Sequence, residues 1–201
     1  IDSVAPDFSL PDVKATAHTL SQYRGSFVVL EWINLDCPFV KKHYDTDNMQ
    51  KLQKTYTGKG VVWLSICSSA EGKQGHLDAQ TVVQRLSKHK ANQTAYLFDK
   101  DGRVGRLYGA KTTPHLFIVN PQGTLVYAGG IDDKPTPKPE DVKNAVNYVA
   151  AALDEARRCL RDRHRRRGHP RQSDRGREEG LMLARSLATL LVALVFTAPC
   201  A

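Results

Sequence analysis

The chain has 201 residues, of which 41% are hydrophobic and 25% are charged. This composition is that of one ordinary globular domain, and it excludes a fully disordered or collagen-like chain. The net charge of +8 is unevenly placed, since residues 1–156 carry +1 and residues 157–185 carry +7. The globular part is therefore nearly neutral, and we expect it to have no nucleic-acid partner.

Apolar periodicity predicts alternating strands and helices in the first 155 residues. After an extended run at 5–10, the expected strands are 17–20, 27–33, 61–66, 96–98, 116–119 and 124–128. The expected helices are 40–56, 79–90 and 140–153, with one or two helical turns at 104–108. A turn at 120–123 makes the last two strands a hairpin. This order predicts an α/β fold with a mixed central β-sheet and helices on both faces.

Cys37 is the most informative residue, because it lies where a buried strand ends and a helix begins. Pro38 follows it and suits the first helical turn. The free N–H groups at a helix N-terminus favour a thiolate, and such cysteines have pKa values lowered from about 8.5 to roughly 3.5–7.5. Lys41, Lys42 and His43 follow and are expected to add positive potential, whereas Asp36 opposes it. We predict that Cys37 is a nucleophile; the alternative is a buried, inert cysteine.

A second feature is Lys111-Thr112-Thr113-Pro114-His115, which directly precedes the strand at 116–119. Proline at the start of a buried strand is unusual unless its missing N–H would be unused. A cis Thr113–Pro114 bond is one interpretation, and an ordinary trans turn is the other. His115 follows this proline, and we expect it either to line the rim of a site or to serve only packing.

These features together resemble the thioredoxin-like redoxin group, which holds the alkyl hydroperoxide reductase/thiol-specific antioxidant proteins and the thiol–disulfide oxidoreductases. The matching segments are Ala5-Pro6-Asp7-Phe8, Trp32 to Pro38, Thr113-Pro114 and Asn120-Pro121-Gln122-Gly123. The resemblance implies a thioredoxin-like fold with Cys37 as the nucleophile and a cis Pro114 facing it. It also implies that Thr113 presents backbone groups to a substrate, with Pro38 and Trp32 beside it.

The chain departs from both known patterns of that group. The second position of a Cys-x-x-Cys pair is Val40, and the Pro and Thr of the pattern Pro-x-x-x-Thr-x-x-Cys are replaced by Leu30 and Asn34. We therefore expect a single-cysteine member. Cys67, at the end of the next strand, is a candidate resolving thiol or a plain core residue. Glu31, within the buried strand, is a candidate proton relay or a carboxylate that faces solvent.

The last segment, residues 156–201, is expected to lie outside the fold. It combines an arginine-rich run with a ten-residue apolar stretch at 187–196, which is too short for a membrane span. Residues 182–201 resemble a secretion signal, which belongs at an N-terminus. We interpret the segment as out-of-frame or read-through sequence. The alternative is a genuine basic tail, and membrane contact is expected only in that case.

The sequence therefore predicts a thiol oxidoreductase that uses Cys37 for thiol–disulfide exchange or peroxide reduction, with a thiol as electron donor. The alternative is a catalytically silent thioredoxin-fold binding module. No pattern for a metal or an organic cofactor is visible. No leader peptide is visible at the N-terminus, so we expect any leader to have been removed or never included, and the compartment stays open between the periplasm or exterior and the cytoplasm.

Overall fold

The computed structural model describes residues 1–168. The chain divides into two units, residues 1–156 and 157–201. The first unit contains a six-stranded sheet, whose spatial order is β1 (Ser3–Val4), β8 (Thr124–Gly129), β7 (His115–Val119), β4 (Val28–Trp32), β5 (Val62–Cys67) and β6 (Ala95–Phe98). A small second sheet pairs β2 (Ser9–Pro11) with β3 (Ala17–Thr19).

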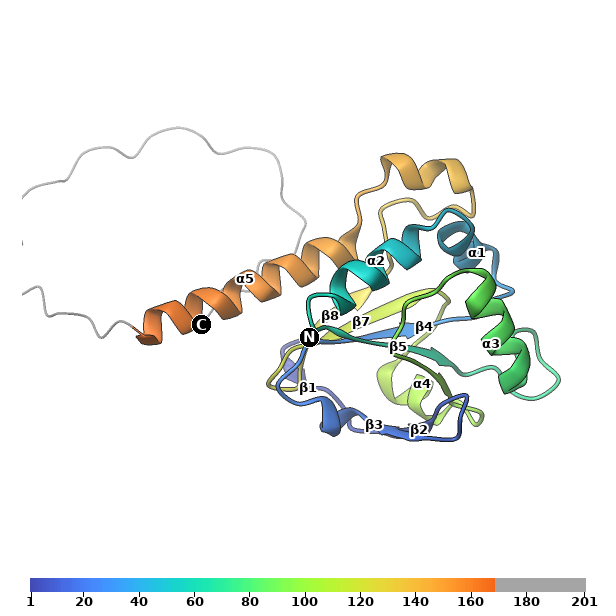
Figure 1. The fold of residues 1–201 in the computed structure, drawn as a ribbon, viewed down its shortest axis with the longest axis horizontal. Helices are drawn as coiled ribbons and strands as arrows, with labels where there is room; N and C mark the ends of the chain where they lie inside the picture. Colours follow the sequence, from blue (N-terminus) through green and yellow to red (C-terminus); the bar gives the residue numbers. More distant parts are fainter. Residues whose placement is uncertain (169–201) are drawn as a thin grey trace, which may run out of the picture. The chain divides into compact units, whose positions relative to one another are not determined.

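The large sheet is mixed. The pairs β4–β5 and β5–β6 are parallel, whereas β7 runs antiparallel to β4 and to β8, and β1 runs antiparallel to β8. The helices are α1 (Pro38–Asp45), α2 (Asn48–Thr57), α3 (Ala79–Lys88), α4 (Arg103–Tyr108) and α5 (Tyr148–Gly168), with 3₁₀ helices η1 (Leu20–Tyr23) and η2 (Pro139–Asn144). Figure 1 shows α1, α2 and α3 on one face of the sheet and α4 with β2 and β3 on the other. The predicted α/β architecture is confirmed, and the fold is thioredoxin-like.

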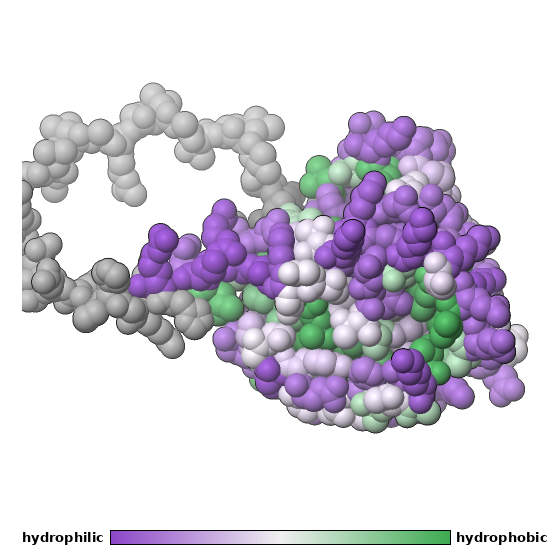
Figure 2. Space-filling view, in the orientation of Figure 1, coloured by the Kyte–Doolittle hydropathy of each residue, from purple (hydrophilic) through white to green (hydrophobic). Residues whose placement is uncertain are grey.

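Alternation along the strands builds a core on each face of the sheet. On the α4 face, Leu30 and Trp32 of β4 belong to one cluster of buried side chains with Phe8, Val104 and Phe117. On the α1 and α2 face lie buried apolar side chains of the helices, among them Val40, Met49, Leu52, Val82, Val149 and Leu153. The outer face seen in Figure 2 is largely hydrophilic, with small hydrophobic patches.

Two predicted helices are wrong in extent. The helix expected at 40–56 is two helices, because Asp47 adopts a left-handed backbone conformation with φ of 58° and interrupts the hydrogen-bond ladder. The helix expected at 140–153 begins only at Tyr148. Residues just before it bond elsewhere: the Val146 N–H donates to the Asp133 carboxylate and the Tyr148 N–H to the Ile131 carbonyl. These bonds to a distant segment replace those that a continuous helix would make.

The features predicted for the C-terminal segment lie mostly outside the described residues. The apolar stretch at 187–196 and the signal-like sequence at 182–201 are among them. Helix α5 continues to Gly168 and so includes the first arginines of that segment. Among the helices that the structure describes, none has the length and apolar character that a bilayer crossing requires.

Candidate active site

Cys37 is the N-cap residue of α1. Its backbone is extended, with φ of −67° and ψ of 128°, and its carbonyl accepts the first hydrogen bonds of the helix from Val40 and Lys41. Pro38 occupies the first helical turn, where its missing N–H costs nothing. The predicted position of the thiol between a buried strand and a helix N-terminus is confirmed, and the positive end of the helix dipole lies beside it.

The Cys37 thiol meets the segment that precedes β7. Its Sγ lies 3.1 Å from the Thr113 carbonyl oxygen, to which it donates a hydrogen bond, and the Thr113–Pro114 peptide bond is cis. Register explains the meeting, because β4 and β7 pair antiparallel with Trp32 opposite His115. The end of β4 and the start of β7 therefore lie side by side, and the structure brings together Cys37, Thr113 and Pro114 as expected. Cys37 is partly exposed.

The loop between β4 and Cys37 is fixed by Asn34. Its backbone carbonyl accepts from the Cys37 N–H at 3.0 Å, and its side-chain oxygen accepts from the Asp36 N–H at 2.8 Å. Its side-chain N–H₂ donates to the Gln74 carbonyl in the loop after β5. That loop approaches so closely that a Cβ on Gly75, whose φ is +88°, would lie 2.4 Å from the Asn34 side chain. Only glycine fits at position 75. The sequence showed a glycine-rich loop there but did not show which glycine is required.

Trp32 is buried, with 3% of its surface exposed. Its ring packs against Tyr108 and Phe117, and its indole N–H donates to the Ser68 hydroxyl at 3.0 Å. Ser68 in turn donates to the Asp99 carboxylate at 2.6 Å. The described contacts of Trp32 are thus those of a core residue, and its role in substrate binding stays a prediction. No pattern in the sequence indicated Ser68 or Asp99.

Glu31 is completely buried on the α1 and α2 face. In the described part of the chain its carboxylate accepts hydrogen bonds from the side chains of Tyr44, Gln53, Trp63 and Ser65. Burial raises the pKa of Glu31, and these four bonds oppose that rise. Because Glu31 is completely buried, the alternative of a solvated carboxylate is wrong. Cys37 is not among its described partners, so the relay stays a prediction without a direct bond.

Cys67 ends β5 and is also buried. Its Sγ lies 3.4 Å from the Gly75 carbonyl oxygen, to which it donates. Both Cys37 and Cys67 are free thiols in this structure. Cys67 is thus engaged by the loop after β5, and a resolving role for it stays a prediction.

Two of the three residues expected to add positive potential do not do so. Lys42 is buried and forms an ion pair with Asp132 at 3.3 Å, while its Nζ also donates to the Lys134 carbonyl. Burial, together with the charge of Lys42, lowers the pKa of His43 to about 4 although Asp132 acts in the opposite direction. His43 is therefore neutral at pH 7, and Asp132 offsets the charge of Lys42. Periodicity alone could not show that these polar residues face inward.

His115 is half-buried beside the cis peptide bond. Its ring lies 4.4 Å from that of Phe117, measured between centroids. Burial lowers the pKa of His115, and the positive charge of Lys111 lowers it further, so the imidazole is neutral at pH 7. Among the residues that the structure describes, no group of three or more His, Cys, Asp or Glu side chains comes together as a metal site would require.

Arg85 is a further residue that the sequence patterns missed. It extends from α3, and its Nη1 lies 2.6 Å from the carboxylate of Asp36, which directly precedes Cys37. Helical periodicity places Arg85 next to the buried Val82 and Leu86, but it does not show which segment lies opposite.

Comparison with known proteins shows which family and fold the chain shares. The profile of the AhpC/TSA family matches residues 1–128. A thiol-disulfide oxidoreductase ResA from Geobacillus thermodenitrificans (strain NG80-2) is 25% identical over 125 residues, which is 62% of this chain. The matched region spans 66% of that relative's length.

Solved structures share the fold. A hypothetical protein from Sinorhizobium meliloti 1021 superposes with a TM-score of 0.63 at 25% identity, covering 77% of this chain and 85% of that one. The thioredoxin domain of a thiol-disulfide oxidoreductase from Bacteroides vulgatus has a TM-score of 0.52 at 18% identity, covering 71% and 95%. With a family profile that matches well over half of its length, this chain belongs to the AhpC/TSA family.

Proposed function

We propose that this protein is a thiol oxidoreductase in which Cys37 is the single nucleophile for thiol–disulfide exchange. The observation that carries the proposal is the position of the Cys37 Sγ, at the N-cap of α1 and 3.1 Å from the Thr113 carbonyl oxygen. The helix N-terminus favours the thiolate, and the backbone at Thr113 offers polar groups that would align an extended substrate beside it. The name of the ResA relative supports the same reaction class.

The reaction balances with one protein thiol and an external one. The Cys37 thiolate attacks one sulfur of a substrate disulfide, which forms a mixed disulfide and releases the other sulfur as a thiolate. A donor thiol, on a protein or a small molecule, then attacks the mixed disulfide. Cys37 leaves as a thiolate, and the donor becomes bonded to the first substrate sulfur until a second donor thiol releases it.

Peroxide reduction is a second candidate, which the AhpC/TSA match supports. The Cys37 thiolate would attack one peroxide oxygen and become a sulfenic acid, while the other oxygen leaves and takes up a proton. A donor thiol would then condense with the sulfenic acid and release water. The Leu30 and Asn34 substitutions remove the usual proline and threonine of a peroxidatic pocket, so we rank this reaction second.

Two assays on one set of variants test these proposals. We expect wild type and Cys67→Ser to form a mixed disulfide with glutathione disulfide, seen by mass spectrometry at Cys37, and we expect Cys37→Ser not to form it. Stopped-flow mixing with hydrogen peroxide separates the two reactions, because a fast reaction there favours peroxide reduction. If Cys37 reacts with neither reagent faster than a cysteine in a short peptide, the protein is a silent binding module instead.

We also propose that residues 1–155 form the working domain and that the segment after it is dispensable. A chain ending at Ala156 is expected to keep the reaction rate of Cys37 unchanged. If the basic tail is genuine, the full chain will float with liposomes of anionic lipid and the shortened chain will not. Sequencing the DNA across this boundary tests the read-through interpretation, which an uninterrupted frame would refute.

A further inference from the structure

The loop that delivers Cys37 carries a charge that works against it. Asp36 directly precedes Cys37, and a carboxylate beside a thiol disfavours the thiolate. The structure does not leave this carboxylate alone, since Arg85 reaches it from α3 at 2.6 Å. The partly exposed pair joins two segments that lie 49 residues apart.

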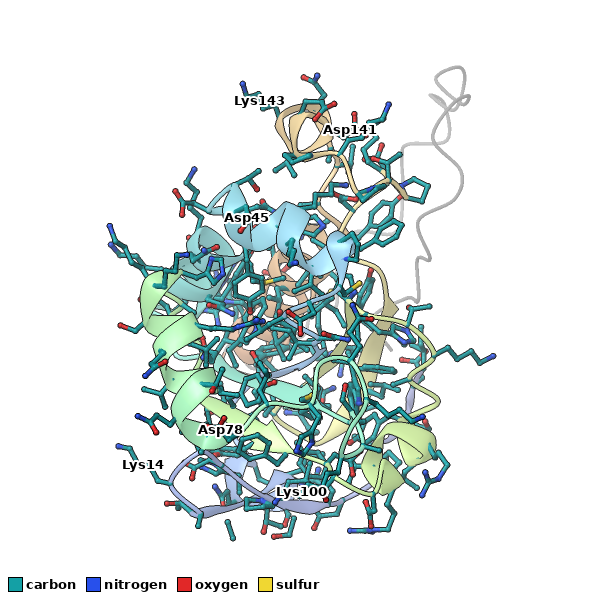
Figure 3. All side chains as sticks on the ribbon, turned by 90° about the vertical axis from the view of Figure 1, so that its right-hand side faces the viewer. Lys14, Asp45, Asp78, Lys100, Asp141 and Lys143 are labelled. Atoms are coloured by element: carbon teal, nitrogen blue, oxygen red, sulfur yellow. The ribbon has the colours of Figure 1, made fainter. Side chains whose placement is uncertain are left out.

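A side-chain cap and apolar packing hold helix α3, and with it Arg85, in place. Asp78, labelled in Figure 3, caps its first turn by accepting hydrogen bonds from the backbone N–H and the hydroxyl of Thr81. Val82 and Leu86 bury the apolar side of the helix. Arg85 therefore extends from a fixed helix toward the loop that delivers Cys37. At the start of that loop, the Asn34 side chain donates a hydrogen bond to the Gln74 carbonyl.

Several other titratable groups lie on the segments that meet at this loop. The titratable groups on the segments that meet at Cys37 are Glu31 on β4, Asp36 in the loop, Lys41, Lys42, His43, Tyr44 and Asp45 on α1, Arg85 and Lys88 on α3 with Asp78 at its N-cap, Lys111 and His115 around Pro114, and Glu71, Lys73 and His76 in the loop after β5. Lys42 is paired with Asp132, and His43 and His115 are neutral at pH 7. Arg85 is the cation that the structure pairs with the carboxylate beside the thiol.

We propose that Arg85 is a positioning residue for Cys37: its ion pair with Asp36 fixes the loop that delivers the thiol and offsets the neighbouring negative charge. This inference rests on the proposed function of Cys37 as a nucleophile. Arg85 acts through Asp36 and does not contact the reacting sulfur. The pair is partly exposed, so its effect is modest and is weakened by salt.

The test is a double-mutant cycle on the full chain, with the rate of iodoacetamide alkylation at Cys37 followed by mass spectrometry of its peptide. At low salt and a pH below the midpoint of the alkylation profile, we expect Arg85→Met to slow alkylation about three-fold and to move the midpoint up by about half a pH unit. Asp36→Asn should accelerate alkylation. In the Asp36→Asn background, Arg85→Met should have a clearly smaller effect, because the ion pair that fixes the loop is already lost there.

Controls separate this role from a structural one. Arg85→Lys keeps the charge and should restore most of the rate, while Lys88→Met removes an exposed cation from the same helix and should leave the rate unchanged. The proposal is overturned if Arg85→Met slows alkylation equally with and without Asp36, or if Lys88→Met has the same effect. Failure of the proposed function looks different, because Cys37 would then react no faster than a peptide cysteine in any variant.

Discussion

Two fully buried carboxylates lie on opposite faces of the central sheet, and they are held by different kinds of donor. Glu31, on the α1 and α2 face, accepts only from side chains in the part of the chain that the structure describes, namely those of Tyr44, Gln53, Trp63 and Ser65. Asp99, on the α4 face, accepts from the backbone N–H groups of Val104 and Gly105 and from the Ser68 hydroxyl. Both are completely buried.

The two carboxylates differ in whether their hydrogen-bond donors can also act as acceptors. A hydroxyl either donates or accepts, so Tyr44 and Ser65 can rearrange around Glu31 when its protonation changes. A backbone N–H only donates, so Val104 and Gly105 require an acceptor at position 99. The Glu31 site therefore tolerates a change of charge, whereas the Asp99 site requires an acceptor and ties α4 to the sheet through Ser68 and Trp32.

The largest effect is expected for Glu31→Ala. The change strands four buried donors and opens a cavity, so we expect it to lower the free energy of unfolding by about 3–4 kcal/mol. Urea denaturation measures this value. Glu71→Ala, which removes an exposed carboxylate, serves as the control and should change stability little. A loss below about 1 kcal/mol for Glu31→Ala would show that the network contributes little to the fold.

Asp99→Asn tests the backbone-bound carboxylate with almost no change in shape. The new N–H₂ group must face either the Val104 N–H or the Gly105 N–H and the Ser68 hydroxyl, so at least one donor loses its acceptor. We therefore expect the free energy of unfolding to fall by about 2–3 kcal/mol. The same denaturation measurement on Asp101→Asn, an exposed neighbour, should give a smaller loss. Equal effects at positions 99 and 101 would contradict the distinction drawn between the two sites.

Ser68→Ala breaks the chain of hydrogen bonds between Trp32 and Asp99. The indole N–H of Trp32 loses its acceptor and Asp99 loses one donor, from which we expect a loss of about 1–2 kcal/mol. The near-ultraviolet circular dichroism of the tryptophans should change as well. Ser69→Ala is the matched control, and an identical spectrum and stability in both variants would refute the link.

Glu31→Gln should cost least, at under about 1 kcal/mol near pH 4.5, because the amide can donate to Tyr44 and accept from Trp63. Its pH dependence is the sharper test. Burial raises the pKa of Glu31 above its ordinary value of 4.5, so above that pH the unfolded chain releases the proton before the folded chain does. Wild type therefore loses stability as the pH rises through this window, and Glu31→Gln does not.

Unfolding free energies at pH 4.5, 6 and 8 check this sign. The stability of Glu31→Gln relative to wild type should grow with pH and then level off once Glu31 ionises in the folded state. A difference that stays constant would show that the four hydrogen bonds balance burial, and one that favours wild type increasingly as the pH rises would show that they outweigh it; either result contradicts the prediction.

The sequence by itself determined the local features. Nearly continuous apolar runs marked β4, β5 and β7, the turn at 120–123 marked the hairpin with β8, and the change from apolar strand to Pro38 placed Cys37 at a helix N-terminus. Each of these depends on residues a few positions apart, which is the range over which periodicity and capping act. The resemblance to redoxins added Pro114, which no local pattern separated from an ordinary turn.

Only the tertiary structure decided how distant polar groups pair. Glu31 and Trp32 are neighbours in one strand, yet they face opposite sides of the sheet and meet different partners. Lys42 and His43 face Asp132 rather than the thiol, and Arg85 faces Asp36. These pairings depend on strand register and on the seating of each helix, which the whole core sets together, so no single segment of sequence encodes them.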